Sequence, residues 1–325
     1  MFRQILVPLD RSALAEQALG RAAAIARASH ATLDVMLAHE PLPVGAFNDV
    51  PWHADQWTEE VSYLGQVVQE LVSGATIQVS HNVLRGGAVE MICQRAREID
   101  ADLIVMTSHG RTGISRFWIG SIADGVVRRA HIPVLVLRPT EEKNRREATR
   151  PFSKILVPLD GSALAAEALK SAATLAQCSG AGLILLRVIQ PVPLVVADVG
   201  LPFAYPATVP DEIATAGLMQ EAKRELEEVA RRVGIESGVD VDSFVVQGVN
   251  VAREIIDFAR GHAIDAIAIS THGRGASRLL VGSVADKVLR ASELPTLVHR
   301  PLLVDADREQ ATAPLIAGET PAMML

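Results

Sequence analysis

The sequence predicts an α/β fold: two tandem open-sheet, Rossmann-like domains with parallel strands. The first observation is that short apolar runs alternate with segments of helical periodicity, as in strand–helix–strand units with right-handed crossovers. The second is an internal repeat: Ile-Leu-Val-Pro-Leu-Asp at 5–10 returns letter for letter at 155–160, and His-Gly-Arg at 109–111 returns at 272–274. A period of about 150 residues is too long for a solenoid, so the chain is a duplicated domain.

The first copy alternates strands and helices in order. Strands are expected at Gln4–Leu9, Leu33–Ala38, Ile77–Leu84, Leu103–Met106 and Val134–Leu137. Helices are expected after the cap residue Ser12 and at Thr58–Ser73, Ala88–Arg97 and Ile122–Ala130. The second copy repeats the end of this series with a strand at Ala266–Ile269, a helix at Val284–Ala291 and a strand at Thr296–His299.

The strand order follows from where the polar loops lie. The loop at Asp10 and the loop at Gly110 share one site only if the first and fourth strands are neighbours. That condition gives the order 3-2-1-4-5, with a switch point between strands one and four where ligands bind in open sheets.

The boundaries are predicted as domain 1 at 1–140, a charged linker at 141–151, domain 2 at 152–301 and a mobile tail at 302–325. The two copies differ after their second strands. Domain 1 has a Pro-rich loop from Pro41 to about Trp57, and domain 2 has a longer one from Pro191 to about Ala216. Segments of this length are lids, interface loops or disordered regions.

Composition excludes several classes of function. The net charge of −7 provides no basic surface for nucleic acid. No apolar run reaches the roughly 18–20 residues that span a membrane, and the first ten residues resemble a strand rather than a signal peptide. Cys93 and Cys178 stand among apolar neighbours without metal or redox spacing, so they are interpreted as core residues. A cytoplasmic protein is expected.

Two groups of residues carry the candidate chemistry. Asp10 follows a central strand and either accepts a hydrogen bond from an adenine amino group or a ribose hydroxyl, or caps the next helix. Ser12 is the more natural cap, which leaves Asp10 freer. Gly110 and Gly120-Ser121 bracket a loop that ends at a helix start, where backbone N–H groups hold phosphate. Taken alone, the glycines could simply form turns. The same glycines recur in the second copy, however, together with an aspartate at the matching distance.

The loop side chains leave alternatives open. Arg111, Arg116, Arg274 and Arg278 either reach phosphate oxygens or form a solvated loop face. His109 and His272 have no second ligand at metal spacing and are interpreted as loop-stabilising side chains.

These motifs resemble the universal stress protein family, here over about 3–138 and 152–300. The ATP-binding members of that family carry Gly-x2-Gly-x9-Gly-(Ser/Thr), so the resemblance implies ATP as ligand, with Mg²⁺ as a companion ion to consider. Carried over residue by residue, it implies nucleotide contacts from Pro8, Asp10, Ser12, Ala38, Met106, Thr107, Gly110, Arg111, Gly113, Gly120, Ser121 and Ile122 in domain 1, and from Pro158, Asp160, Ser162, Val188, Ser270, Gly273, Arg274, Gly282, Ser283 and Val284 in domain 2.

The chain departs from the family motif at two points. The first glycine is Thr107 in domain 1 and Ser270 in domain 2. Nine residues separate Gly110 from Gly120, but only eight separate Gly273 from Gly282, so the domain 1 site is expected to be the better formed.

The expected function is an adenine-nucleotide-binding sensor or regulator under stress, and not an enzyme. No lysine stands in either glycine stretch to assist phosphoryl transfer, so ATP hydrolysis, if present, is slow. The alternatives are a nucleotide-free interaction module and, less favoured, a nucleotide-dependent enzyme of a related α/β class. In keeping with how the family dimerises, Val134–Leu137 and Thr296–His299 are expected to pair the domains as an intramolecular pseudo-dimer, with a homodimer as a further option.

Overall fold

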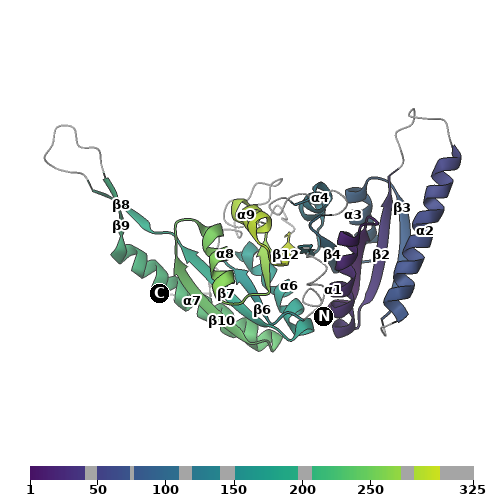
Figure 1. Ribbon diagram of the computed structural model, residues 1–325. Coiled ribbons are helices and arrows are strands. Elements are labelled where there is room, and N and C mark those ends of the chain that lie inside the picture. The colour runs from purple at the N-terminus through teal and green to yellow at the C-terminus, as the bar shows by residue number, and fades with distance from the viewer. Residues whose placement is uncertain are drawn as a thin grey trace, which may run out of the picture.

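The computed structural model describes residues 1–40, 50–73, 77–109, 119–139, 151–196, 207–271 and 282–300. The predicted tail at 302–325 lies outside these residues, as does the predicted linker apart from Pro151. Both domains are present as α/β units (Figure 1).

The described elements follow the predicted alternation. Domain 1 contains β1 (Gln4–Leu9), α1 (Ala13–Ser29), β2 (Thr32–His39), α2 (Val50–Ser73), β3 (Val79–Arg85), α3 (Ala88–Glu98), β4 (Leu103–Thr107), α4 (Ser121–Arg129) and β5 (Val134–Leu137). Domain 2 contains β6 (Lys154–Pro158), α6 (Ala163–Ser179), β7 (Gly182–Ile189), β8 (Val192–Val196), β9 (Ala207–Asp211), α7 (Glu212–Ser237), β10 (Val241–Gln247), α8 (Val251–Gly261), β11 (Ala266–Ser270), α9 (Ser283–Ala291) and β12 (Thr296–His299).

The two domains share one ten-stranded sheet, in the order β10-β7-β6-β11-β12-β5-β4-β1-β2-β3. Within each domain this is the predicted order 3-2-1-4-5, and all these neighbours are parallel. The junction pairs β12 with β5 antiparallel, with Leu297 opposite Leu135. The two strands expected to pair the domains, Val134–Leu137 and Thr296–His299, therefore lie side by side at the junction.

Burial explains why the central strands have apolar runs instead of alternating patterns. Helices cover both faces of a parallel sheet, so its strands are buried on both sides. All five residues of β4 and of β11 are buried. One hydrophobic cluster runs through both domains from β1 and α1 to β6 and α6, and Cys178 belongs to it. Cys93 belongs to a second cluster, which confirms that both cysteines are core residues.

Side chains of α4 and α9 connect the domains at the junction. Arg290 reaches Asp124 at 3.2 Å, and Arg128 lies 3.7 Å from Asp286. Each arginine also pairs with the aspartate four residues earlier on its own helix. The four side chains are about two-thirds buried or more, so the cluster is less screened than a surface ion pair.

Arg138 closes the C-terminal end of α9 from the other domain. Its Nε donates to the carbonyl of Ser292 at 3.0 Å, and its Nη2 donates to the carbonyls of Leu289 and Arg290. The last carbonyls of a helix have no partner within the helix, so this side chain satisfies groups that would otherwise be left unpaired.

Arg138→Ala is therefore expected to lower the free energy of unfolding by about 1–3 kcal/mol, because it strips several buried acceptors of their donor. Urea unfolding measures the loss. Arg3→Ala is the matched control, since the Arg3 side chain is 85% exposed and its ion pair with Asp102 spans 3.8 Å. Such a pair contributes well under about 1 kcal/mol. Equal effects of the two changes would contradict the bridging role of Arg138.

Two expectations about the long loops were wrong. Helix α2 begins at Val50 instead of Thr58, because Pro51 is tolerated in the first turn of a helix, where its missing N–H has no partner to lose. The segment from Pro191 to Ala216 contains the antiparallel strands β8 and β9 and the start of α7. Pro193 lies opposite Pro210 in this separate two-stranded sheet.

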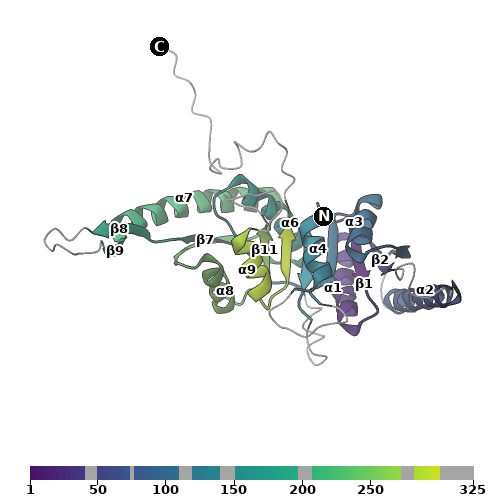
Figure 2. The same cartoon turned by 90° about the horizontal axis from the view of Figure 1, so that it is seen from above.

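The β8–β9 hairpin extends away from the rest of domain 2, as both views show (Figures 1 and 2). Asp211 ends the hairpin and caps α7 by accepting a hydrogen bond from the Ala214 N–H at 2.9 Å. None of the described helices has the length and apolar composition needed to cross a bilayer.

Candidate functional site

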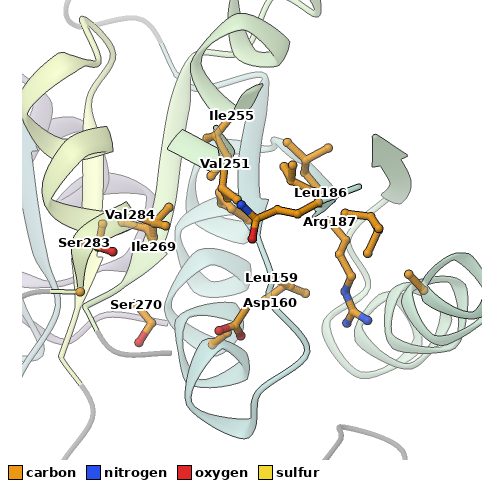
Figure 3. A pocket seen from close by; sticks show the side chains of 18 of the residues that line it. Leu159, Asp160, Leu186, Arg187, Val251, Ile255, Ile269, Ser270, Ser283 and Val284 are labelled. Atoms are coloured by element: carbon orange, nitrogen blue, oxygen red, sulfur yellow. The ribbon is translucent and has the colours of Figure 1, made fainter. Parts of the chain in front are cut away.

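A cavity of about 680 Å³ lies at the carboxyl ends of β6, β7 and β11 in domain 2. This volume is typical of small-molecule sites. Its lining includes Pro158, Asp160, Val188, Ser270, Gly282, Ser283 and Val284, all of which the sequence predicted as ligand contacts. Figure 3 shows Ser270 and Ser283 at one side of the cavity, Arg187 at the other, and Asp160 between them.

The loop after β6 fixes the position of Asp160. Its Oδ1 accepts hydrogen bonds from the Ser162 N–H at 2.9 Å and the Ser162 hydroxyl at 2.6 Å. Ser162 in turn caps α6 by accepting from the Ala165 N–H at 3.2 Å. Gly161 between them has a φ of +87°, which glycine adopts without steric cost.

Domain 1 repeats this arrangement. Asp10 Oδ1 accepts from the Ser12 N–H at 3.0 Å and from its hydroxyl at 2.6 Å, and Ser12 caps α1. The expectation that a capping Ser12 leaves Asp10 freer was wrong, because the cap residue itself binds the carboxylate. Position 11 here is an arginine with a φ of +68°, a conformation that costs a non-glycine residue about 1–2 kcal/mol.

The glycine before each last helix is required by the protein's own backbone. The Gly282 N–H donates to the Thr271 carbonyl at 2.6 Å, and an added Cβ at Gly282 would lie 2.9 Å from that oxygen. Gly120 makes the same contact with the Ser108 carbonyl, at 2.7 Å for the hydrogen bond and 3.0 Å for an added Cβ. These contacts hold the start of the last helix against the residue that directly follows β11 or β4.

The helix starts themselves are open. Gly120 and Gly282 are the N-caps of α4 and α9, and as glycines they supply no side-chain capping hydrogen bond themselves. Ser121 and Ser283 are the first helical residues, and their side chains are exposed. Helix N-termini carry unpaired N–H groups and a partial positive charge, so this geometry favours an anion such as phosphate.

The polar residues at the end of β4 support the loop. The Thr107 hydroxyl donates to the His109 carbonyl at 2.9 Å, and Ser108 Oγ lies 3.0 Å from His109 Nδ1. Burial and the nearby Arg138 lower the pKa of His109, so the imidazole is neutral at pH 7. The predicted loop-stabilising role of His109 fits these contacts. Thr107 is 6% exposed, and the hydroxyl at the first-glycine position therefore serves the protein's own backbone.

Several of the predicted nucleotide-contact residues of domain 1 lie at or near the carboxyl ends of its strands, as their counterparts do in domain 2. Pro8 lies in β1, Ala38 in β2, and Met106 and Thr107 end β4, while Ile122 follows Ser121 in α4. Gly110, Arg111, Gly113, Gly273 and Arg274 lie outside the described residues, as do Arg116, Arg278 and His272. The relative quality of the two sites, expected to favour domain 1, stays a prediction.

Sequence reasoning missed Arg187, Glu221 and Glu225, which also line the domain 2 cavity. Arg187 is 5% exposed and its Nη1 lies 2.6 Å from Glu225 Oε2. The available signal was an arginine within the apolar run Leu183–Ile189, where a charge is costly unless a partner or ligand meets it.

The comparisons with known proteins agree with the fold and the duplication. The model of the family described as "Universal stress protein family" matches residues 1–138 and 151–300. A universal stress protein of Methanocaldococcus jannaschii is 27% identical over 146 residues, 44% of this chain and 86% of its own. A Staphylococcus aureus (strain USA300) protein named after the same family is 29% identical over 147 residues, 43% of this chain and 86% of its own.

Two solved structures match most of both chains. A universal stress protein from Archaeoglobus fulgidus superimposes with a TM-score of 0.67 at 19% identity, covering 91% of this chain and 98% of that one. A functionally unknown protein from Pseudomonas aeruginosa PAO1 gives 0.63 at 20% identity, covering 92% and 93%. At these identities the two structures support the fold alone.

Proposed function

Since the chain belongs to the universal stress protein family, we propose that it binds ATP or a related adenine nucleotide and acts as a sensor or regulator in the stress response. In this proposal the nucleotide is a signal and not a substrate for rapid turnover.

One observation carries the proposal: the domain 2 cavity is lined by residues that the repeated sequence motifs had predicted as ligand contacts. The open N-terminus of α9, at Gly282 and Ser283, is the phosphate end. Asp160 stands one strand away, at a position to accept from a ribose hydroxyl or a base amino group. The same pieces recur in domain 1 at Asp10, Gly120 and Ser121.

The lining of the cavity supports binding over catalysis. Among the described residues that line it there is no lysine, and the arginine found there lies on β7, two strands from the end of β11. Phosphoryl transfer relies on cations that neutralise the charge developing on the phosphates. Any Mg²⁺ would be held chiefly by the phosphates of the nucleotide.

The test is the nucleotide content of the purified full chain, measured by denaturation and chromatography of the supernatant, followed by calorimetry with added ATP. We expect one to two adenine nucleotides per chain. Two would mean that the shorter loop of domain 2 still forms a site. No nucleotide, together with no heat of ATP binding, would overturn the proposal and leave a nucleotide-free interaction module.

A further inference from the structure

We propose that Arg187 binds the ribose of the nucleotide in the domain 2 cavity, by donating hydrogen bonds to the 2′- and 3′-hydroxyl oxygens. The inference rests on the proposed function in one respect, that this cavity holds an adenine nucleotide. It goes further by assigning a selectivity: domain 2 prefers a ribonucleotide to the corresponding deoxyribonucleotides.

Arg187 is a buried side chain with two unpaired donors. Its side chain is 6% exposed, and its Nη1 lies 2.6 Å from Glu225 Oε2. Its Nε and Nη2 are enclosed and have no hydrogen-bond partner among the described residues. Since buried donors are nearly always satisfied, these two nitrogens of a cavity-lining residue indicate a ligand that accepts hydrogen bonds from them.

The two nitrogens form one edge of the planar guanidinium. Arg95 shows in the same chain what such an edge binds: its Nε and Nη2 donate side by side to the two carboxylate oxygens of Asp34, at 3.1 and 2.8 Å. Arg187 therefore offers two parallel donors, and the matching part of a ligand carries two acceptors next to each other.

An adenine nucleotide has few such pairs of acceptors. The adenine ring sets its N7 acceptor beside the N6 amino donor, so that one donor of Arg187 would face another donor. The phosphates have a binding position at the start of α9, on the other side of the cavity. The 2′- and 3′-hydroxyl oxygens of the ribose remain. They are neighbours on the sugar ring, and each hydroxyl accepts as well as donates hydrogen bonds.

Two glutamates of α7 suit the hydrogens of the same two hydroxyls. Glu225 holds Arg187, and Glu221, about one helical turn earlier, also lines the cavity. A hydroxyl that accepts from the guanidinium still has its own hydrogen to donate, and a carboxylate accepts more than one hydrogen bond. Acidic side chains bind ribose hydroxyls in this way in dinucleotide sites. This side of the cavity therefore presents donors and acceptors together, as a diol requires.

The strand order directs the ribose toward Arg187. Strand β6 separates β7 from β11, so about 10 Å lie between β7 and the strand that precedes α9. The register sets Arg187 level with Leu159, one residue before Asp160. Figure 3 shows Ser283 and Arg187 on opposite sides of the cavity. A nucleotide with its phosphates at Ser283 therefore extends across the cavity toward Arg187.

The adenine ring has a separate place in the apolar part of the cavity. Side chains alternate along a strand, so Leu186 and Val188 face away from the side of the sheet on which Arg187 meets α7. They pack in one apolar cluster with Val251 and Ile255 of α8. Figure 3 shows Val251 and Ile255 together, apart from the Arg187 guanidinium. The apolar wall suits the flat face of the base and leaves Arg187 to the sugar.

Domain 1 has a leucine where domain 2 has this arginine. The registers of the first two strands in each domain match Arg187 with Leu37. Arg187→Leu thus gives domain 2 the residue that domain 1 already has. Arg187→Met is the second variant, an unbranched apolar side chain that fills the space without donating. Neither variant leaves a fully buried charge, because the Glu225 side chain is 26% exposed.

The experiment is calorimetric titration of the full chain with ATP and, separately, with 2′-deoxy-ATP and 3′-deoxy-ATP. The domain 2 component is the part that Gly282→Ala removes. We expect ATP to bind domain 2 at least about tenfold more tightly than either deoxy analogue, because a buried donor of Arg187 stays unpaired when its hydroxyl is missing. Both Arg187 variants are expected to bring the two ratios near one.

The ratio distinguishes ribose binding from a packing role of the side chain. A variant that only disturbed packing would weaken ATP and its deoxy analogues equally, and the ratio would stay as in the unaltered chain. Arg253→Leu is the control, an arginine whose side chain is 77% exposed on α8 and which is not among the cavity-lining residues. Its ratio should equal that of the unaltered chain, and thermal unfolding verifies that each variant is folded.

The outcomes separate this inference from the proposed function. Binding of the deoxy analogues to domain 2 as tightly as ATP, or a ratio that the Arg187 variants leave unchanged, overturns the ribose contact while nucleotide binding stands. Absence of binding by ATP and by both analogues overturns both.

Discussion

Replacing Gly282 with alanine is expected to abolish nucleotide binding in domain 2 and to lower the free energy of unfolding by about 1–3 kcal/mol. The added Cβ would lie 2.9 Å from the Thr271 carbonyl oxygen, and both groups are backbone, so the clash is relieved only by moving the chain. The movement would lengthen the 2.6 Å hydrogen bond between Gly282 and Thr271 and displace the start of α9 from the cavity. When the start of α9 is displaced, its backbone N–H groups no longer point at the phosphate position, and binding is lost even where the domain stays folded.

Gly217→Ala is the matched control for this change. Gly217 lies within α7, and an added Cβ there meets nothing within 4 Å. Alanine at that position is expected to raise stability by up to about 1 kcal/mol, because glycine is a poor helix former. Calorimetry for binding and urea unfolding for stability measure both variants. Unchanged affinity in Gly282→Ala would contradict the role given to this helix start.

Asp34→Ile is expected to lower the free energy of unfolding of domain 1 by about 3 kcal/mol. The Asp34 side chain is 1% exposed and holds Arg95 bidentately, with Ser80 donating at 2.6 Å to the same carboxylate. Removal of one partner leaves a buried charge uncompensated, which costs about 3–5 kcal/mol. We expect the lower end of this range because the Arg95 side chain is 19% exposed and keeps Glu98 at 3.7 Å as a second partner.

Domain 2 supplies the rescue for this variant. Ile184 stands at the position of Asp34, and Phe258 stands at the eighth residue of α8, where α3 has Arg95. Both belong to an apolar cluster. The double variant Asp34→Ile with Arg95→Phe is expected to recover most of the lost stability, since an apolar pair can replace a buried ion pair at little cost. Urea unfolding of the two single variants and the double variant tests this coupling; simple additivity of their effects would refute it.

The sheet order could be predicted because it followed from chemistry and from the repeat. The loops at Asp10 and Gly110 share one site only if β1 and β4 are neighbours, and these two strands are neighbours in the sheet. Ser12 was identified as a helix cap because only the cap position explains a serine directly before a helical pattern. The β8–β9 hairpin was missed because its strands contain Pro193 and Pro210, which read as loop residues and which a two-stranded sheet tolerates.

The candidate site was predicted less completely, for physical reasons. Loop glycines are visible in a sequence, but the reason for Gly282, the closeness of the Thr271 carbonyl, is a contact that only the folded chain contains. Arg187 was missed because its ion-pair partner Glu225 stands 38 positions away on α7, the helix from which Glu221 also lines the cavity. Helical spacing makes those glutamates look like an ordinary solvated face.

The antiparallel pairing of β5 with β12 within one chain determines which two domains are paired in every molecule. If the two domains were separate chains, they would pair at random. A domain with an altered site would then occur paired with itself as well as with the unaltered domain. Here the partner of each domain is part of the same chain, at an effective concentration that no competing subunit matches. The composition of the pair is therefore fixed at one of each kind. Differences such as Leu37 against Arg187 occur once in every molecule, and the two halves are free to specialise in different ligands.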